Sequence, residues 1–232
     1  MSQIPLSVAL PDQARLESFH PGPNAAVLEY LRNFADPVAW LWGPAGSGKS
    51  HLCQAMCRAG RELGQRCAYF ALAAVPLPSP ALLKGWESAT LLCFDDIDRV
   101  AGDRDWEEAL FTLFNHTREQ GGRWLVSSVA PPSAVPIELE DLRSRLGWGP
   151  VFELRAMADN DRLRALRLRA GYRGLELPDD TGRYLLTRFS RDTHSLFRLL
   201  DDLDQASLRA QRRLTIPFVK SVVADSEPSA PR

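Results

Sequence analysis

The sequence lacks the features of a membrane or exported protein. No apolar run among its 232 residues reaches about 18 residues, the length that a membrane-spanning helix needs. The segment 1–10 has no basic stretch followed by a small-residue cleavage site, so we expect no secretory signal. These two absences predict a cytoplasmic protein that has no membrane partner.

Cysteine and lysine are also scarce. The four cysteines have no further cysteine or histidine cluster beside them, so we expect reduced, mostly buried thiols and no zinc site. They are Cys53, Cys57, Cys67 and Cys93. Only three lysines accompany 25 arginines, and the formal net charge is −1. A net charge this close to zero argues against a broad basic surface for nucleic acid and leaves local basic patches open.

The residues that are present fit a soluble α/β protein, with 45% hydrophobic and 25% charged residues. Short apolar segments rich in β-branched and aromatic residues predict five strands, at 38–42, 66–72, 91–94, 124–128 and 151–154. Helical patterns separate them, at 24–34, 50–63, 106–120 and 139–146. This alternation predicts an α/β fold with a five-stranded parallel sheet that helices cover on both faces.

After residue 158 the pattern changes to helices alone. Four are predicted, at 160–170, 179–189, 194–212 and 217–223. We therefore divide the chain into an N-terminal segment (1–17), an α/β core (18–158), a small all-helical domain (159–223) and a tail (224–232). The tail is rich in Pro and Ser, and we expect it to be disordered.

The strongest motif is a phosphate-binding loop between the first strand and the helix after it. G-x-x-x-x-G-K-[ST] is matched at every required position by Gly43, Pro44, Ala45, Gly46, Ser47, Gly48, Lys49 and Ser50. Its backbone N–H groups and the helix N-terminus would bind phosphate oxygens. Lys49 would reach the β and γ phosphates, and the Ser50 hydroxyl would hold Mg²⁺. The alternative is a glycine-rich turn that binds nothing.

Paired acids follow the third strand. Asp95 and Asp96 come directly after four apolar residues, at the strand end where α/β sheets place ligands. We predict that Asp95 holds Mg²⁺ and that Asp96 polarises the attacking water as a general base. The alternative is a solvated acidic turn, because three more aspartates follow closely.

Several segments together resemble the AAA+ ATPases, and within them the DnaA-like branch that includes the bacterial replication initiator and its regulatory inactivators. They are 18–24, 95–98, 142–149 and 209–220, and the resemblance runs from about Gln3 to Val223. It implies that residues 18–158 are an AAA+ nucleotide-binding core and that residues 159–223 are its helical lid.

The resemblance also implies roles for individual residues. Arg145 corresponds to an arginine finger that acts on a neighbouring subunit's nucleotide, with Arg143 as a rival and an ordinary salt-bridged arginine as the alternative. Phe19, His51, Ser128 and His194 are assigned to the nucleotide site. Ser128 and the neutral His194 replace stronger γ-phosphate ligands of the family, so we expect slow ATP hydrolysis and an ADP- or ATP-bound protein.

The N-terminus resembles a peptide that docks on the sliding clamp, the β subunit of DNA polymerase III. The residues concerned are Gln3, Ile4, Pro5 and Leu6, and a frayed terminus or an edge strand is the alternative. The function implied is inactivation of DnaA on the DNA-loaded clamp, by stimulated hydrolysis of DnaA-bound ATP. DNA would be contacted mainly through the clamp, and a homodimer is possible.

Three other functions share parts of this pattern. A helicase-loader-type ATPase acting on single-stranded DNA would also need the P-loop, Asp95 and a finger. A small-molecule kinase fits the Arg145 segment less well, because that segment suits hydrolysis across subunits. A scaffold with a vestigial nucleotide site conflicts with the intact Lys49 and Ser50.

Overall fold

The computed structural model describes residues 14–74, 79–189 and 193–226 of the chain. Contacts divide it into two compact units, Met1–Ala156 and Met157–Arg232. In the described residues, no helix combines the length and the apolar character needed to cross a membrane.

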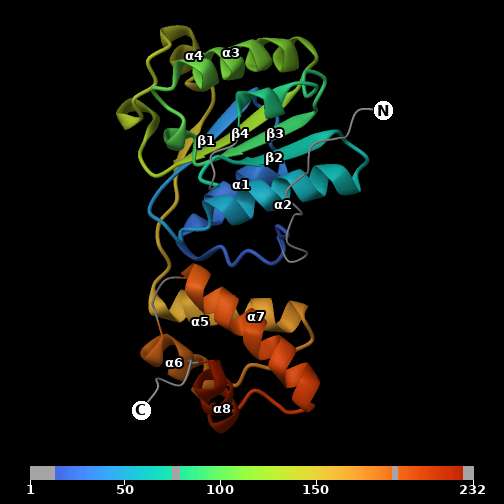
Figure 1. Ribbon diagram of the computed structural model, residues 1–232, viewed down its shortest axis with the longest axis vertical. Coiled ribbons are helices and arrows are strands. Elements are labelled where there is room, and N and C mark those ends of the chain that lie inside the picture. Colours follow the sequence, from blue (N-terminus) through green and yellow to red (C-terminus); the bar gives the residue numbers. More distant parts are fainter. Residues whose placement is uncertain (1–13, 75–78, 190–192, 227–232) are drawn as a thin grey trace. The chain divides into compact units, whose positions relative to one another are not determined.

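A parallel five-stranded sheet forms the centre of the first unit (Figure 1). Its strand order is β2-β3-β4-β1-β5. The strands are β1 (Val38–Trp42), β2 (Cys67–Ala71), β3 (Leu91–Asp95), β4 (Arg123–Ser128) and β5 (Val151–Glu153). Because Leu41 pairs with Ser127 and Phe94 with Val126, the carboxyl end of β4 lies between the ends of β1 and β3. The predicted five-stranded parallel sheet is confirmed.

Helices cover both faces of this sheet (Figure 1). On one face lie α1 (Ala25–Arg32) and α2 (Lys49–Glu62), and on the other lie α3 (Arg104–Glu119) and α4 (Glu140–Leu146). Single 3₁₀ turns at η1 (Gly22–Asn24), η2 (Pro80–Leu83), η3 (Ile97–Arg99) and η4 (Pro132–Ala134) complete the connections.

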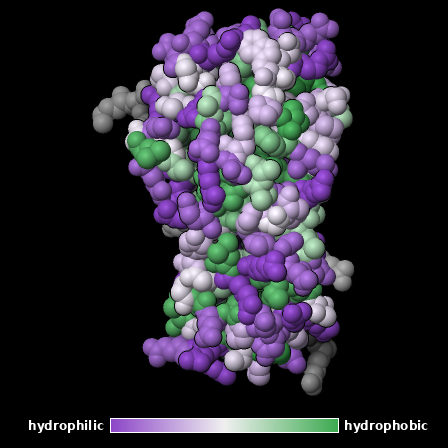
Figure 2. Space-filling model, turned by 180° about the vertical axis from the view of Figure 1, so that it is seen from behind, coloured by the Kyte–Doolittle hydropathy of each residue, from purple (hydrophilic) through white to green (hydrophobic). Residues whose placement is uncertain are grey.

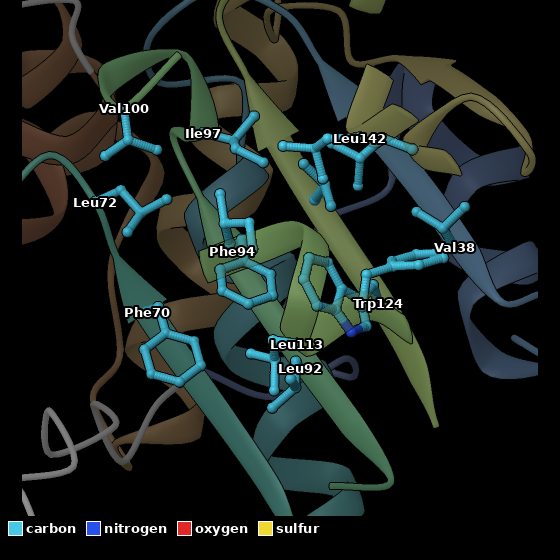
Figure 3. Close-up of a cluster of buried hydrophobic side chains, with 14 of the residues drawn as sticks. Val38, Phe70, Leu72, Leu92, Phe94, Ile97, Val100, Leu113, Trp124 and Leu142 are labelled. Carbon is cyan, nitrogen blue, oxygen red and sulfur yellow. The ribbon is translucent and has the colours of Figure 1, made fainter. Parts of the chain in front are cut away.

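Strand alternation builds a separate core on each face of the sheet. Trp124 and Val126 of β4 belong to the cluster under α3 and α4, whereas Leu125 belongs to the cluster under α1 and α2. In the first cluster the side chains of Trp124 and Phe94 lie side by side (Figure 3), with their ring centroids 4.3 Å apart. Truncating an aromatic ring in such a packed core costs about 3–5 kcal/mol, so these side chains fix the sheet that carries the P-loop.

The second unit consists of helices in its described residues. They are α5 (Asp159–Tyr172), α6 (Asp179–Arg188), α7 (Thr193–Ala210) and α8 (Ile216–Ser226). Its core contains leucines of α5, α6 and α7 together with Phe218 and Val219 of α8. Arg173, the residue after α5, pairs with both Asp201 and Asp204 of α7, at 2.8 and 2.9 Å. On the face that Figure 2 shows, hydrophilic residues predominate on both units. The predicted all-helical second domain is confirmed.

Candidate functional site

The P-loop joins the end of β1 to the start of α2 and requires glycine at two close contacts. Gly43 has φ +152°, and a Cβ there would lie 2.3 Å from the Leu154 carbonyl oxygen. Gly48 has φ +102°, and a Cβ there would lie 2.6 Å from Phe19 Cε2. The backbone between them therefore curls into a tight loop at a helix N-terminus, the geometry that binds phosphate.

Lys49 and Ser47 make the inside of this loop polar. Lys49 is only 5% exposed, and its Nζ donates to the Gly43 carbonyl at 2.7 Å and to the Pro44 carbonyl at 3.1 Å. The Ser47 hydroxyl is buried and forms no hydrogen bond in the described structure. A buried ammonium and an unpaired hydroxyl in one glycine-rich loop fit a phosphate ligand, which would bond to both.

Asp95 ends β3 as a buried carboxylate. It is 4% exposed and accepts hydrogen bonds from the Tyr69 hydroxyl, at 2.8 Å, and from the Ser127 hydroxyl. Ser50, exposed in the first turn of α2, is the second predicted Mg²⁺ ligand. Among the described residues no group of three or more His, Cys, Asp or Glu side chains could hold a metal ion. The pair of oxygen donors Asp95 and Ser50 suits Mg²⁺, which typically binds one or two protein oxygens together with nucleotide phosphates.

Asp96 adopts a left-handed backbone conformation, with φ 59° and ψ 53°, which is uncommon for a residue other than glycine. Its N–H donates to Ser127 Oγ at 3.0 Å. Burial raises the pKa of its carboxyl, and the negative charge of Asp95 raises it further, while Lys49 acts in the opposite direction. The two acids therefore remain close together at an energetic cost.

Ser127, which sequence reasoning did not select, is the β4 hydroxyl that contacts these acids. Ser128, the predicted phosphate contact, is fully buried. Its hydroxyl accepts from Trp40 Nε1 at 2.7 Å and donates to the Ala130 carbonyl at 2.5 Å. A role of Ser128 at the γ-phosphate stays a prediction. Strand alternation was the available signal, because Ser127 follows Leu125 on the face that α2 covers.

The segment before α1 packs beside the P-loop. The Phe19 ring is 8% exposed, lies against Gly48, and has its centroid 5.7 Å from that of His51. His51 Nε2 lies 2.9 Å from the Arg15 carbonyl oxygen. Phe19 and His51 are 32 positions apart in the sequence, and both are predicted nucleotide-site residues. The structure places their rings side by side.

Arg145 lies in the last turn of α4 and contacts two aromatic rings. Its guanidinium carbon is 5.2 Å from the centroid of Phe111 and 5.1 Å from that of Trp148. Among the described residues no carboxylate forms an ion pair with it. The rival Arg143 instead donates to the Ile137 carbonyl at 3.3 Å and lies 3.7 Å from Glu140.

The roles of two further groups of predicted site residues stay predictions. His194 belongs to the first turn of α7 in the second unit, so its role toward a nucleotide stays a prediction. Gln3, Ile4, Pro5 and Leu6 lie outside the described residues, and their docking role also stays a prediction.

Comparisons with known proteins give two matches to family models. Residues 159–223 match the Hda lid domain, and residues 39–119 match RNA helicases. The second match contains both the P-loop and the acidic end of β3.

Solved structures of similar fold come from DNA-processing AAA+ proteins. Domain III of DnaA from Thermotoga maritima has a TM-score of 0.74 at 18% identity and covers 95% of this chain and 100% of that one. AMPPCP-bound DnaA from Aquifex aeolicus has a TM-score of 0.63 at 23% identity, over 83% of this chain and 65% of that one. The T. maritima RuvB branch migration motor has a TM-score of 0.59 at 17% identity, over 87% and 66%.

The structural likenesses establish the fold, and the family match adds the type of lid. A parallel sheet carrying a P-loop, followed by a lid of the Hda type, is thus an AAA+ arrangement. The chain therefore has the AAA+ fold of the DnaA structures, and its residues 159–223 match the lid domain of Hda.

Proposed function

We propose that this protein inactivates the replication initiator DnaA by inserting Arg145 into the site where DnaA holds ATP. Hydrolysis there would leave DnaA bound to ADP and prevent re-initiation of replication. The observation that carries the proposal is the state of Arg145, which aromatic rings hold in place and which no carboxylate neutralises in the described structure.

A guanidinium in this setting suits an arginine finger. It is planar and permanently charged, so it can stabilise the charge that develops on a γ-phosphate, an effect worth about 10³ to 10⁵ in rate in other NTPases. Contacts with Phe111 and Trp148 orient the group but leave its charge in place. Arg143 is less suited, because Glu140 offsets part of its charge.

The chain's own nucleotide would be ATP or ADP with Mg²⁺. A DnaA from A. aeolicus binds AMPPCP on the same fold, which supports an adenine nucleotide at the P-loop. Lys49 would contact the β and γ phosphates, Ser50 and Asp95 would hold Mg²⁺, and Asp96 would orient water. Hydrolysis at this site is expected to be slow, since the Ser128 hydroxyl is already engaged by Trp40 and Ala130.

Docking on the sliding clamp through Gln3, Ile4, Pro5 and Leu6 would bring the protein to DNA. Such a tether raises the local concentration of Arg145 near DnaA without requiring a basic DNA-binding surface. The formal charge of −1 agrees with this arrangement. A homodimer is compatible with it, because a finger supplied in trans acts across an interface between subunits.

The test is the turnover of DnaA-bound ATP with clamp-loaded DNA, comparing wild type with Arg145→Ala and Arg143→Ala. We expect Arg145→Ala to lower the stimulated rate about a thousandfold or more, as in other NTPases that depend on a finger. Arg143→Ala, on the same short helix, should change it little. Gln3→Ala should lower the rate only when the reaction depends on the clamp. A full rate with Arg145→Ala would refute the proposal.

A nucleotide titration separates this function from that of a scaffold with a vestigial site. Lys49→Ala removes the buried ammonium from the loop and should abolish binding of ADP and ATP. Lys84→Ala is the control, because Lys84 is an exposed lysine outside the P-loop. Equal nucleotide affinity in the two variants would mean that the P-loop is not the binding site.

The second candidate is a motor or loader that acts on single-stranded nucleic acid. The match of residues 39–119 to RNA helicases favours it. It predicts that single-stranded DNA or RNA stimulates the protein's own ATPase in the absence of DnaA. The proposed inactivator predicts no such stimulation.

A further inference from the structure

Glu107 is a buried carboxylate that accepts four hydrogen bonds from three backbone N–H groups. It lies in the first turn of α3 and is 2% exposed. Its Oε1 accepts from Gly102 N at 2.7 Å and from Glu138 N at 3.1 Å. Its Oε2 accepts from Glu138 N at 3.1 Å and from Leu139 N at 2.7 Å.

These bonds join two loops and do little for the helix that carries Glu107. The N-terminus of α3 is already capped by Asp103, whose side chain accepts from Trp106 N at 3.2 Å. Gly102 lies in the loop between η3 and α3, and η3 begins just after Asp96. Glu138 and Leu139 lie in the other loop, immediately before α4. Among the described residues no cation pairs with Glu107, so its charge depends on these N–H donors.

The Glu107 carboxylate therefore binds two successive N–H groups at the start of α4, beside the apolar packing of Ile137 and Leu142. The helix spans only seven residues, Glu140–Leu146, too few to be stable by itself. Leu139 is its N-cap residue and contributes no capping side chain. Arg145 lies in its last turn, so any tilt at Leu139 displaces the guanidinium.

We propose that Glu107 is the positioning residue for Arg145. Its carboxylate holds the start of α4 against the loop that follows Asp96. The inference rests on the proposed function, because it concerns how the finger reaches a partner's nucleotide. Glu107 touches no nucleotide and acts only through the backbone of α4. A displacement of about 1 Å can cost about a hundredfold in rate, so a fixed α4 matters for catalysis in trans.

The discriminating variants are Glu107→Gln and Glu108→Gln. Glutamine keeps one acceptor oxygen but points an NH₂ group at N–H donors, so either Gly102 or Leu139 loses its partner. Glu108 is the matched control, an adjacent, exposed glutamate of α3 that pairs with Arg104 at 2.7 Å.

The assay is the turnover of DnaA-bound ATP on clamp-loaded DNA, measured against increasing concentrations of each variant. A misplaced finger lowers the maximal rate, here by about tenfold or more, at an unchanged half-saturating concentration. A merely unfolded fraction would raise the half-saturating concentration and leave the maximal rate intact. An unchanged maximal rate for Glu107→Gln, with Arg145→Ala strongly impaired in parallel, would overturn the inference alone. An unimpaired Arg145→Ala would instead refute the proposed function.

Leu139→Pro keeps the inference testable if Glu107→Gln does not fold. Leu139 has φ −73°, which proline adopts without strain, so this variant deletes one N–H donor and keeps the carboxylate. It also removes the Leu139 side chain that packs against the core, so Leu139→Ala is the matched control and should keep a higher maximal rate. For Leu139→Pro we expect a reduced maximal rate at an unchanged half-saturating concentration. A full maximal rate would count against Glu107 as the positioning residue.

Discussion

Asn24 and Arg155 are 131 positions apart and exchange two hydrogen bonds. Asn24 Nδ2 donates to the Arg155 carbonyl at 3.0 Å, and the Arg155 N–H donates to Asn24 Oδ1 at 2.8 Å. The side-chain amide is 3% exposed, so both bonds are shielded from water. They join the segment that carries Phe19 to the chain that leaves β5, and thereby close the core around the P-loop.

Asn24→Ala should therefore destabilise the core. Two lost hydrogen bonds, with the Arg155 backbone left unpaired, predict a loss of about 1–3 kcal/mol in the free energy of unfolding. Denaturant unfolding measures this loss. Asn33→Ala, at an exposed asparagine after α1, is the control and should cost much less. Equal losses would mean that the Asn24 bonds contribute little.

Gly43→Ala should be more damaging than an alanine at another left-handed glycine. At Gly43 the new methyl group would lie 2.3 Å from the Leu154 carbonyl oxygen, and neither backbone can move without distorting β1 or the chain after β5. Gly64 also has a positive φ, +74°, but a methyl group there meets nothing within 4 Å. Gly64→Ala thus isolates the backbone strain, about 1–2 kcal/mol.

Thermal unfolding and nucleotide titration of both variants test this difference. Gly43→Ala should unfold at a clearly lower temperature and lose nucleotide binding, whereas Gly64→Ala should keep its binding. If both variants were equally stable, the contact between Gly43 and Leu154 would not constrain the loop.

Local features of the sequence predict the sheet and the P-loop. Each strand is a short apolar run, and the phosphate loop is a contiguous motif in its required context between β1 and α2. Asp95 follows in the same way from its position at a strand end. These signals depend on neighbours in the chain, so one sequence suffices to recognise them.

Contacts between distant segments could not be predicted in this way. The choice between Ser127 and Ser128 depends on which face of β4 α2 covers, and the pairing of Asn24 with Arg155 depends on the closed fold. The spacing of Glu107 to Leu110 and Phe114 places it on the apolar face of α3, but its backbone partners at 102, 138 and 139 depend on the closed fold. Arg145 is identified through a resemblance; its contact with Phe111 depends on the packing of α3 against α4, whereas Trp148 lies only three positions after it in the sequence.

The cysteines should be unreactive while the protein is folded. All four are free and buried. Burial raises the pKa of Cys57 to about 11 and raises the pKa values of Cys53 and Cys93 well above the ordinary range. At pH 8 the reactive thiolate of Cys57 is therefore rare.

Titration with a thiol reagent at pH 8, with and without denaturant, tests this expectation. No thiol should react rapidly in the native protein, and all four should react after unfolding. A single fast-reacting thiol in the native state would show that one side of the core under α2 opens to solvent.

Asp96→Asn should stabilise the protein at neutral pH. A folded-state pKa raised by burial and by Asp95 means that the folded protein binds this proton more tightly than the unfolded chain. Its favourable contribution is complete below the ordinary aspartate pKa and is lost as pH rises through the raised value. At pH 7 the charged carboxyl is therefore a net cost, which asparagine removes while tolerating the left-handed backbone.

The melting temperature of Asp96→Asn should exceed that of wild type by a few degrees at pH 7, and the difference should shrink as pH falls below the ordinary aspartate range. Asp105→Asn removes the same charge from an exposed site in α3 and should give no such gain. A lower melting temperature for Asp96→Asn at pH 7 would mean that Lys49 compensates the Asp96 charge more than Asp95 opposes it. The predicted gain instead implies that a destabilising charge is kept at the nucleotide site, as expected for a carboxylate needed to orient water.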